Sequence, residues 1–248
     1  MTNLKKALQV NEAKGKGVTV SPSYAMKQLM IKMKNEIQVA LPSQLASERF
    51  QRVALTAFNS NPKLQTCDPM TFIAAMMQSA QLGLEPNTPL GQAYLIPYKV
   101  KGMDKVQFQI GYKGLLELAH RSGKIKTLYA HEVRKNDEFD IDYGLEQKLT
   151  HKPLLTGDRG DVIGYYAVYH LEPSGYSFVF MTKDEVMEHG KKYSKNFEGG
   201  IWAKEFDSMA KKTVIKKLLK YAPLSIEMQK AVAFDESVKN SIDSDMLL

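Results

Sequence analysis

The chain has 248 residues, of which 44% are hydrophobic and 25% charged, as expected of a globular protein that buries a core in one large or two small domains. Its net charge of +7 favours a polyanionic partner, either nucleic acid or an acidic membrane. The single cysteine, Cys67, excludes an intramolecular disulfide and suits a reducing cytoplasm. The N-terminus shows no signal-peptide pattern, and no apolar run is long enough to span a bilayer.

Charge is unevenly distributed along the chain. Residues 1–34 hold seven lysines and one glutamate, whereas residues 221–248 hold two lysines and five acids. Residues 1–22 lack an apolar period, which predicts a flexible basic segment. We therefore expect one folded domain at 23–222, preceded by this segment. A short helix and an acidic, disordered tail are expected at 223–248.

Three helices are expected in the first third of the chain, at 24–41, 48–58 and 69–82. The third is the best defined, because Asp68 can cap its first turn, Pro69 suits its first position and Gly83 suits its exit. Ser47 is the expected cap of the second helix.

Alternating apolar residues then predict strands at 93–100, 105–110, 125–133, 138–142, 162–171 and 176–181, with helices starting near residues 112 and 183 and ending near 123 and 189. Residues 101–104 would close a hairpin, and Pro97 places its strand at a sheet edge. Thr182 and Glu185 form a capping box. This order predicts an α+β fold, with a small, mainly antiparallel sheet and helices packed against it.

A lysine-rich stretch at 201–222 predicts one unbroken helix. Lys212, Lys216 and Lys220 lie four residues apart on one arc, about 6 Å between neighbours, close to the phosphate spacing of a single nucleic-acid strand. Trp202 on the same side suits base stacking. The alternative is a solvated lysine face with the aromatic residue in the core. Lys211 falls on the apolar arc, so its charge needs a partner.

A second basic region follows the predicted strand at 105–110. Its polar face carries Gln107 and Gln109, and the next helix begins in a glycine-bearing turn, where anions are favoured. The basic residues here are Lys113, Arg121, Lys124, Lys126, Arg134 and Lys135. A solvated helix is the alternative interpretation.

An acidic cluster offers a different function. Asp140 precedes Glu146 and Lys148, a loose match to the pattern of metal-dependent nucleases, in which carboxylates hold Mg²⁺. For Asp140 and Asp142, the solvent-facing side of one strand is the simpler explanation. No phosphate-binding loop of an ATPase and no paired metal-ligand spacing is present in the sequence. A basic structural or membrane-surface protein is a third possibility.

Several segments together resemble the RecT family of phage single-strand annealing proteins. They are Gln81–Pro86, Leu90–Pro97, Gln109–Gly114, Ala119–Gly123, and Trp202 followed by Met209–Thr213, and the resemblance runs in order from about residue 40 to about 233. It implies an ATP-independent, non-enzymatic recombinase with a strand-annealing-protein-like core and a basic groove. It also implies binding of single-stranded DNA and annealed duplex, and assembly into rings or helical filaments. Implied partners are a 5′–3′ exonuclease and the host single-strand-binding protein, in the bacterial cytoplasm and without a membrane.

Together, the residues and the resemblance predict a DNA site in which two basic walls face each other and grip the backbone, within a DNA-binding and oligomerisation domain at 23–222. Packing between subunits is an alternative role for its aromatic residues. No cofactor is expected, apart from Mg²⁺ as a modulator of DNA binding. The predicted site residues are Gln107, Gln109, Tyr112, Lys113, Arg121, Lys124, Lys126, Thr127, Phe197, Trp202, Lys204, Lys211, Lys212, Lys216 and Lys217.

Overall fold

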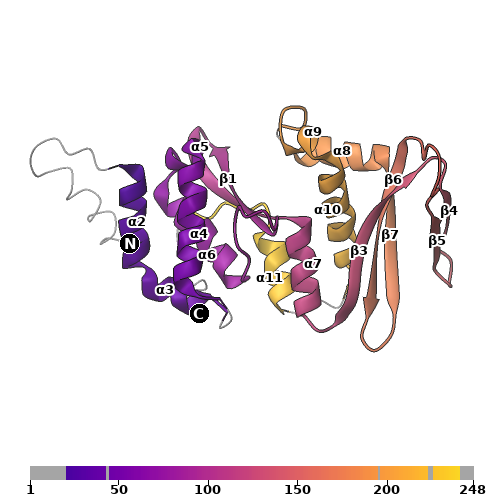
Figure 1. Cartoon of the computed structure of the whole chain (residues 1–248), viewed down its shortest axis with the longest axis horizontal. Coiled ribbons are helices and arrows are strands. Elements are labelled where there is room, and N and C mark those ends of the chain that lie inside the picture. The colour runs from indigo at the N-terminus through magenta and orange to yellow at the C-terminus, as the bar shows by residue number, and fades with distance from the viewer. Residues whose placement is uncertain (1–20, 43–44, 195, 223–225, 241–248) are drawn as a thin grey trace, which may run out of the picture.

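The computed structural model describes residues 21–42, 45–194, 196–222 and 226–240 (Figure 1). Its helices are α2 (Pro22–Lys32), α3 (Lys34–Ala40), α4 (Ser47–Ser60), α5 (Pro62–Gln65), α6 (Pro69–Gln81), α7 (Tyr112–Arg121), α8 (Lys183–Tyr193), α9 (Ile201–Lys204), α10 (Phe206–Leu219) and α11 (Ile226–Phe234). Its strands are β1 (Ala93–Val100), β2 (Met103–Ile110), β3 (Ile125–Arg134), β4 (Glu138–Asp142), β5 (Lys148–Lys152), β6 (Val162–Leu171) and β7 (Tyr176–Thr182).

The α+β class is confirmed, but the described strands form three small antiparallel sheets instead of one. Their orders are β1-β2, β3-β6-β7 and β4-β5. Helices α2 to α6 gather around β1 and β2 at one end of the molecule, the other two sheets lie at the opposite end, and α7 and α11 lie between (Figure 1). One buried apolar cluster runs from Met26 in α2 to Ala231 in α11. No helix in the described part of the chain combines the length and apolarity that a membrane span needs.

The hairpin of β1 and β2 follows the predicted alternation. Val106, Phe108 and Ile110 are fully buried against α6 and its neighbours, whereas the glutamines between them are half-buried. The turn is shorter than expected, because β2 begins at Met103. The two residues of that turn, 101 and 102, both have positive φ, the geometry that matches the twist of a two-residue hairpin.

The three-stranded sheet is covered on both faces, which explains the almost continuous burial of β6. Tyr165 and Ala167 belong to the main cluster, on the face against which α10 packs. Tyr166 and Val168 point the other way, into a smaller apolar cluster that includes Phe139 of β4. Strand β5, which was not predicted, completes this second cover by pairing with β4. Helices therefore cover one face and a hairpin covers the other.

Two long predicted helices are each divided in the structure. The 24–41 helix bends at Met33, which leaves helical geometry (φ −101°, ψ 18°) while the apolar face stays against the core. The 201–222 helix breaks at Glu205 (φ −133°, ψ 49°) into α9 and α10. No glycine or proline lies at either break, so tertiary contacts end these helices. Ser47 was also predicted wrongly as a cap, because the chain becomes helical one residue earlier and Ala46 holds the cap position.

The helix ends read from local chemistry are confirmed. Asp68 caps α6 by accepting a hydrogen bond from the amide of Met70, and Gly83 leaves the helix with φ +61°. Thr182 and Glu185 form the reciprocal capping box of α8, although that helix extends to Tyr193. These signals are short-range, so they depend little on the rest of the fold.

The residues directly after α11 do not form the disordered tail that the sequence predicts there. Residues 235–240 lie along β2, where the amide of Phe108 donates to the carbonyl of Ser237 over 3.1 Å. The amide of Ile110 donates to Asp235 Oδ1, and Lys105 Nζ contacts Asn240 Oδ1. In Figure 1 this segment runs from α11 toward β1 and β2. Residues 1–20 and 241–248, which hold the rest of the predicted flexible ends, lie outside the described residues.

Candidate nucleic-acid interface

A pocket of about 860 Å³ lies between the β1–β2 hairpin, the start of α7 and the α9–α10 region. Five of the predicted site residues line it, namely Gln109, Tyr112, Lys113, Lys204 and Lys212. They come from two regions of the sequence, residues 109–113 and 204–212, so the fold brings part of the predicted site together.

The glycines of the 111–114 turn set the shape of one wall. A Cβ added to Gly114 would lie 2.1 Å from the carbonyl oxygen of Gln92, and one added to Gly111 would lie 2.1 Å from that of Gly91. The loop before β1 therefore packs directly on the first turn of α7, and only glycine permits this approach. The α7 N-terminus, which has no side-chain cap, opens at the pocket, so its amides add positive potential there.

The positive charge of the pocket comes mainly from two exposed lysines, Lys113 and Lys204. Within the described part of the chain neither forms an ion pair, whereas Lys212 deeper in the pocket does. One exposed carboxylate, Glu205, also lines the pocket. The balance favours an anion that reaches the two exposed lysines.

Two tyrosines supply flat apolar surface beside these charges. Tyr112 was predicted as a site residue, whereas Tyr94 was not, although it lies within one of the segments that carry the family resemblance. Tyr94 is 37% exposed, and burial of the rest of its ring, with the nearby Glu205 carboxylate, raises its pKa. Its hydroxyl therefore stays protonated at neutral pH and can donate a hydrogen bond.

The predicted lysine stripe of α10 is not a single exposed face. Lys211 pairs with Glu132 of β3 over 2.8 Å, which confirms that it needed a partner. Lys212 is only 5% exposed and pairs with Asp235 over 3.1 Å, and Lys216 reaches the same carboxylate over 2.7 Å. Lys217 alone of the predicted α10 lysines is exposed to solvent. The interpretation of Lys212 and Lys216 as free surface cations was therefore wrong, because their partners lie in the segment after α11.

The buried Asp235 carboxylate and the ammonium of Lys216 both have shifted pKa values. Burial disfavours the charged form of Lys216, but the carboxylates of Asp235 and Glu236 outweigh it and raise the pKa of Lys216. Burial likewise opposes ionisation of Asp235, yet Lys212 and Lys216 hold its pKa below the usual range. Asp235 and Lys216 therefore both stay charged at neutral pH.

The remaining predicted residues lie away from the pocket. Arg121, at the far end of α7, donates to the carbonyl of Leu82 over 2.8 Å and pairs with Glu117. Lys126 pairs with Glu172 over 3.6 Å. Lys124 is exposed, and Thr127 is half-buried with its hydroxyl unpaired within the structure described. Of the basic residues in the second basic region of the sequence, only Lys113 lines the pocket.

Two of the predicted aromatic contacts are internal. Trp202 is 6% exposed and packs against Phe197, with their ring centres 5.6 Å apart, over Gly190 of α8. These rings therefore stabilise the junction of α8 and α9 within the chain. Gln107 is also engaged, since its amide donates to the carbonyl of Glu236 over 2.7 Å.

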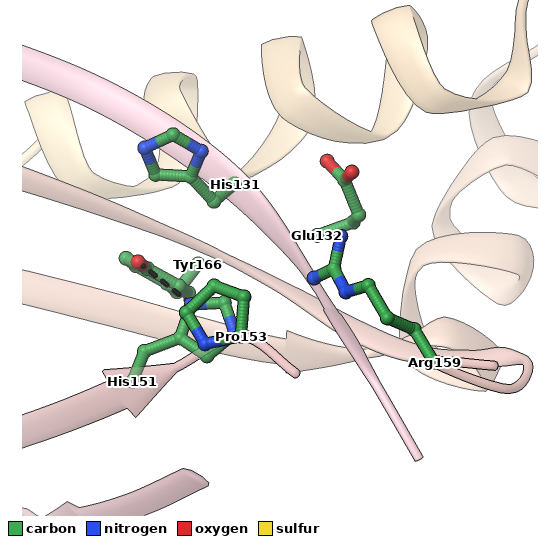
Figure 2. Close-up of a pocket in the computed structure, with 6 residues that line it drawn as sticks. All are labelled: His131, Glu132, His151, Pro153, Arg159 and Tyr166. Atoms are coloured by element: carbon green, nitrogen blue, oxygen red, sulfur yellow. Dashed lines mark hydrogen bonds between the residues drawn. The ribbon is translucent and has the colours of Figure 1, made fainter. Parts of the chain in front are cut away.

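A second hollow, of about 300 Å³, is lined by residues of β3, β5, β6 and the loop after β5, and none of the predicted site residues lines it. Figure 2 shows His151 hydrogen-bonded to Tyr166, with Arg159 entering from the other side. The side chain of Asp137, which is 0% exposed, accepts two hydrogen bonds from Arg159 and one from His151. These groups satisfy one another, so the cluster anchors the loop after β5.

The environment of Asp137 predicts that the folded protein loses stability in acid. The hydrogen bond from Arg159 holds the pKa of this carboxyl well below its usual range, although burial acts in the opposite direction. A depressed pKa contributes stability above the unfolded value near 4, and this contribution is lost as pH falls through the folded value. Asp137→Asn is therefore expected to lower Tm at pH 7 by about 5 to 10 °C and to flatten the decline below about pH 4. Thermal melts from pH 2 to 7 measure this, with Asp140→Asn, an exposed strand residue, as control. An equally steep acid decline in the Asp137→Asn variant would contradict the assignment.

The nuclease alternative receives no support from the described residues. No group of three or more His, Cys, Asp or Glu side chains there is arranged to hold a metal ion. Asp140 and Glu146 are exposed, and Asp142 accepts a hydrogen bond from the amide of Gly144 over 2.7 Å. For Asp140 and Asp142, which both lie on β4, the strand-face explanation fits better.

Lysines beside tyrosines at an open helix N-terminus are typical of proteins that bind a polyanion with aromatic bases. A family model described as the RecT family matches residues 48–246, and the chain belongs to this family of recombination proteins. It is 43% identical to Protein RecT of Escherichia coli strain K12 over 217 residues, which are 85% of this chain and 79% of that protein. It is also 36% identical over 205 residues to the uncharacterized protein YqaK of Bacillus subtilis strain 168, covering 79% of this chain and 66% of that protein.

Proposed function

We propose that this chain is an ATP-independent single-strand annealing protein of phage homologous recombination, which binds DNA by its backbone and pairs complementary strands. One observation carries the proposal. Segments separated in sequence that resemble the family, including Leu90–Pro97, Gln109–Gly114 and Met209–Thr213, all contribute to the lining of the 860 Å³ pocket. Their convergence is expected if the family's common activity resides there.

The chemistry of the pocket suits a strand held by its phosphates. Lys113 and Lys204 are free to contact phosphate oxygens, and the α7 N-terminus adds positive potential without sequence preference. Tyr94 and Tyr112 offer ring faces that any base can stack on. Contacts of this kind leave base edges free for a complementary strand, so pairing itself supplies the free energy and no nucleotide is hydrolysed.

The same proposal includes assembly and partners. Repeated copies in a ring or helical filament would hold a strand extended while registers are tested, and the annealed duplex would remain bound. A 5′–3′ exonuclease would expose the strand. In the bacterial cytoplasm, this chain would contact the host single-strand-binding protein on that strand. Mg²⁺ would act by screening phosphates rather than as a bound cofactor.

The test uses two complementary end-labelled oligonucleotides mixed with the full chain, without ATP and with Mg²⁺. The expected result is faster pairing than in buffer alone, with both strands at their original lengths on a denaturing gel. Shortened strands would instead indicate the nuclease that uses Asp140, Glu146 and Lys148. If the strands are neither paired nor shortened, the remaining interpretation is a basic structural protein. Electron microscopy after successive addition of the strands would distinguish ring from filament.

A further inference from the structure

The segment after α11 places two acids on lysines beside the pocket. Asp235 contacts Lys212 and Lys216 at 3.1 and 2.7 Å, and Glu236 contacts the same two lysines at 3.5 and 3.4 Å. Two neighbouring carboxylates thus occupy a lysine pair whose first member lines the pocket. An acid bound to a lysine competes with a phosphate for it, because each contact takes up one of the three ammonium hydrogens.

The two carboxylates differ in how firmly they are held. The side chain of Asp235 is 0% exposed and also accepts the amide of Ile110 over 2.8 Å, so it anchors the segment. The side chain of Glu236 is 42% exposed and its lysine contacts are longer, so water and salt weaken them. Glu236 is therefore the carboxylate that can leave while Asp235 stays.

The backbone at Glu236 is consistent with a displaceable contact. Its φ is +62°, a left-handed conformation that a residue with a Cβ disfavours. The carbonyl of Glu236 is held by Gln107, and the next residue pairs with Phe108. Contacts with β2 and the lysines thus hold Glu236 in a backbone conformation that is unfavourable without them.

We propose that Glu236 is an intramolecular competitor of the bound strand, covering Lys212 and Lys216 until a phosphate displaces it. This inference rests on the proposed function. Displacement exchanges one anion for another on the same lysines, so the pair stays neutralised throughout. Lys216, whose side chain is 29% exposed, is the more accessible of the two lysines. The device would favour long strands over isolated anions, because only a strand already held by Lys113 and Lys204 presents a phosphate at high local concentration.

The test compares Glu236→Gln with Glu138→Gln in the full chain, by fluorescence anisotropy with a labelled oligo(dT). Glu138 is a matched control, because it is exposed, pairs with Lys152 over 2.7 Å and lies on β4 at the far end of the molecule (Figure 1). Both variants remove one negative charge. Release of an exposed ion pair predicts about three- to fivefold tighter binding for Glu236→Gln alone, with a salt slope steeper by up to ~0.7. Equal affinities of the two variants, or weaker binding by Glu236→Gln, would overturn the inference.

Hydrogen exchange gives an independent readout on the unmodified chain. Saturating oligo(dT) is expected to raise deuterium uptake at residues 236–240, whereas unchanged or lower uptake would contradict displacement. Failure of the inference differs from failure of the proposed function. If the wild-type chain binds DNA but Glu236→Gln binds no tighter than Glu138→Gln, only the inference fails. If neither the wild type nor Glu236→Gln binds, both fail.

Discussion

Replacing Asp235 with alanine is expected to lower the free energy of unfolding by about 3 to 5 kcal/mol. The physical reason is that the ammonium of Lys212, only 5% exposed, would be left in a buried site without its closest partner. The amide of Ile110 would also lose its acceptor. Urea denaturation followed by far-UV circular dichroism measures the change.

Two comparison variants make this result specific. Glu138→Ala removes an exposed acid from a surface pair, and its expected cost is below about 1 kcal/mol. Lys212→Met combined with Asp235→Leu removes both buried charges and is expected to recover much of the loss, because apolar packing then replaces the pair. A loss for Asp235→Ala no larger than that for Glu138→Ala would show that the segment after α11 does not stabilise the fold.

Lys113→Ala combined with Lys204→Ala is expected to weaken binding of single-stranded DNA by ~10-fold or more near 0.1 M salt. Both side chains are exposed on the pocket and carry charge that no described carboxylate neutralises by an ion pair. Loss of two phosphate contacts should reduce the slope of log affinity against log salt by about 1.4. Anisotropy titrations at several salt concentrations measure both quantities, and the annealing rate should fall in parallel.

The control is Lys27→Ala combined with Lys32→Ala, which removes the same charge from two exposed residues of α2. This pair lies outside the pocket, so its effect should be limited to the small change in overall charge. Similar losses in the two double variants would remove the pocket from the DNA site. Lys212→Ala combined with Lys216→Ala, the pair that the sequence singled out, is a poorer probe, because it also uncovers the buried Asp235.

Local chemistry in the sequence was sufficient for much of the fold. The strands at 138–142 and 162–171 have the predicted bounds, and the caps at Asp68 and Thr182 form as expected. Each depends on residues within a few positions of one another. The breaks at Met33 and Glu205 were missed, because no local breaker marks them.

The candidate site was only partly predictable for a related reason. Lys113 and Lys204 face the pocket as positive charges next to glycine turns, a pattern readable from nearby residues. Tyr94 lay within a recognised segment but was not singled out. Trp202 matched the pattern of a stacking residue, yet Phe197 and Gly190 bury it. Aromatic rings can pack in a protein core or stack on nucleic-acid bases, so their local sequence pattern does not distinguish these two roles.

By itself the sequence determined the family, the α+β class, the basic character and most element ends, because these follow from composition and from short-range hydrogen-bonding and apolar patterns. Only the tertiary structure decided which lysines are free. Lys211 meets Glu132 on β3, and Lys212 and Lys216 meet Asp235 beyond the next helix. Whether a cation is available to a ligand depends on the carboxylate that the fold places beside it, and helical periodicity contains no information about that distant partner.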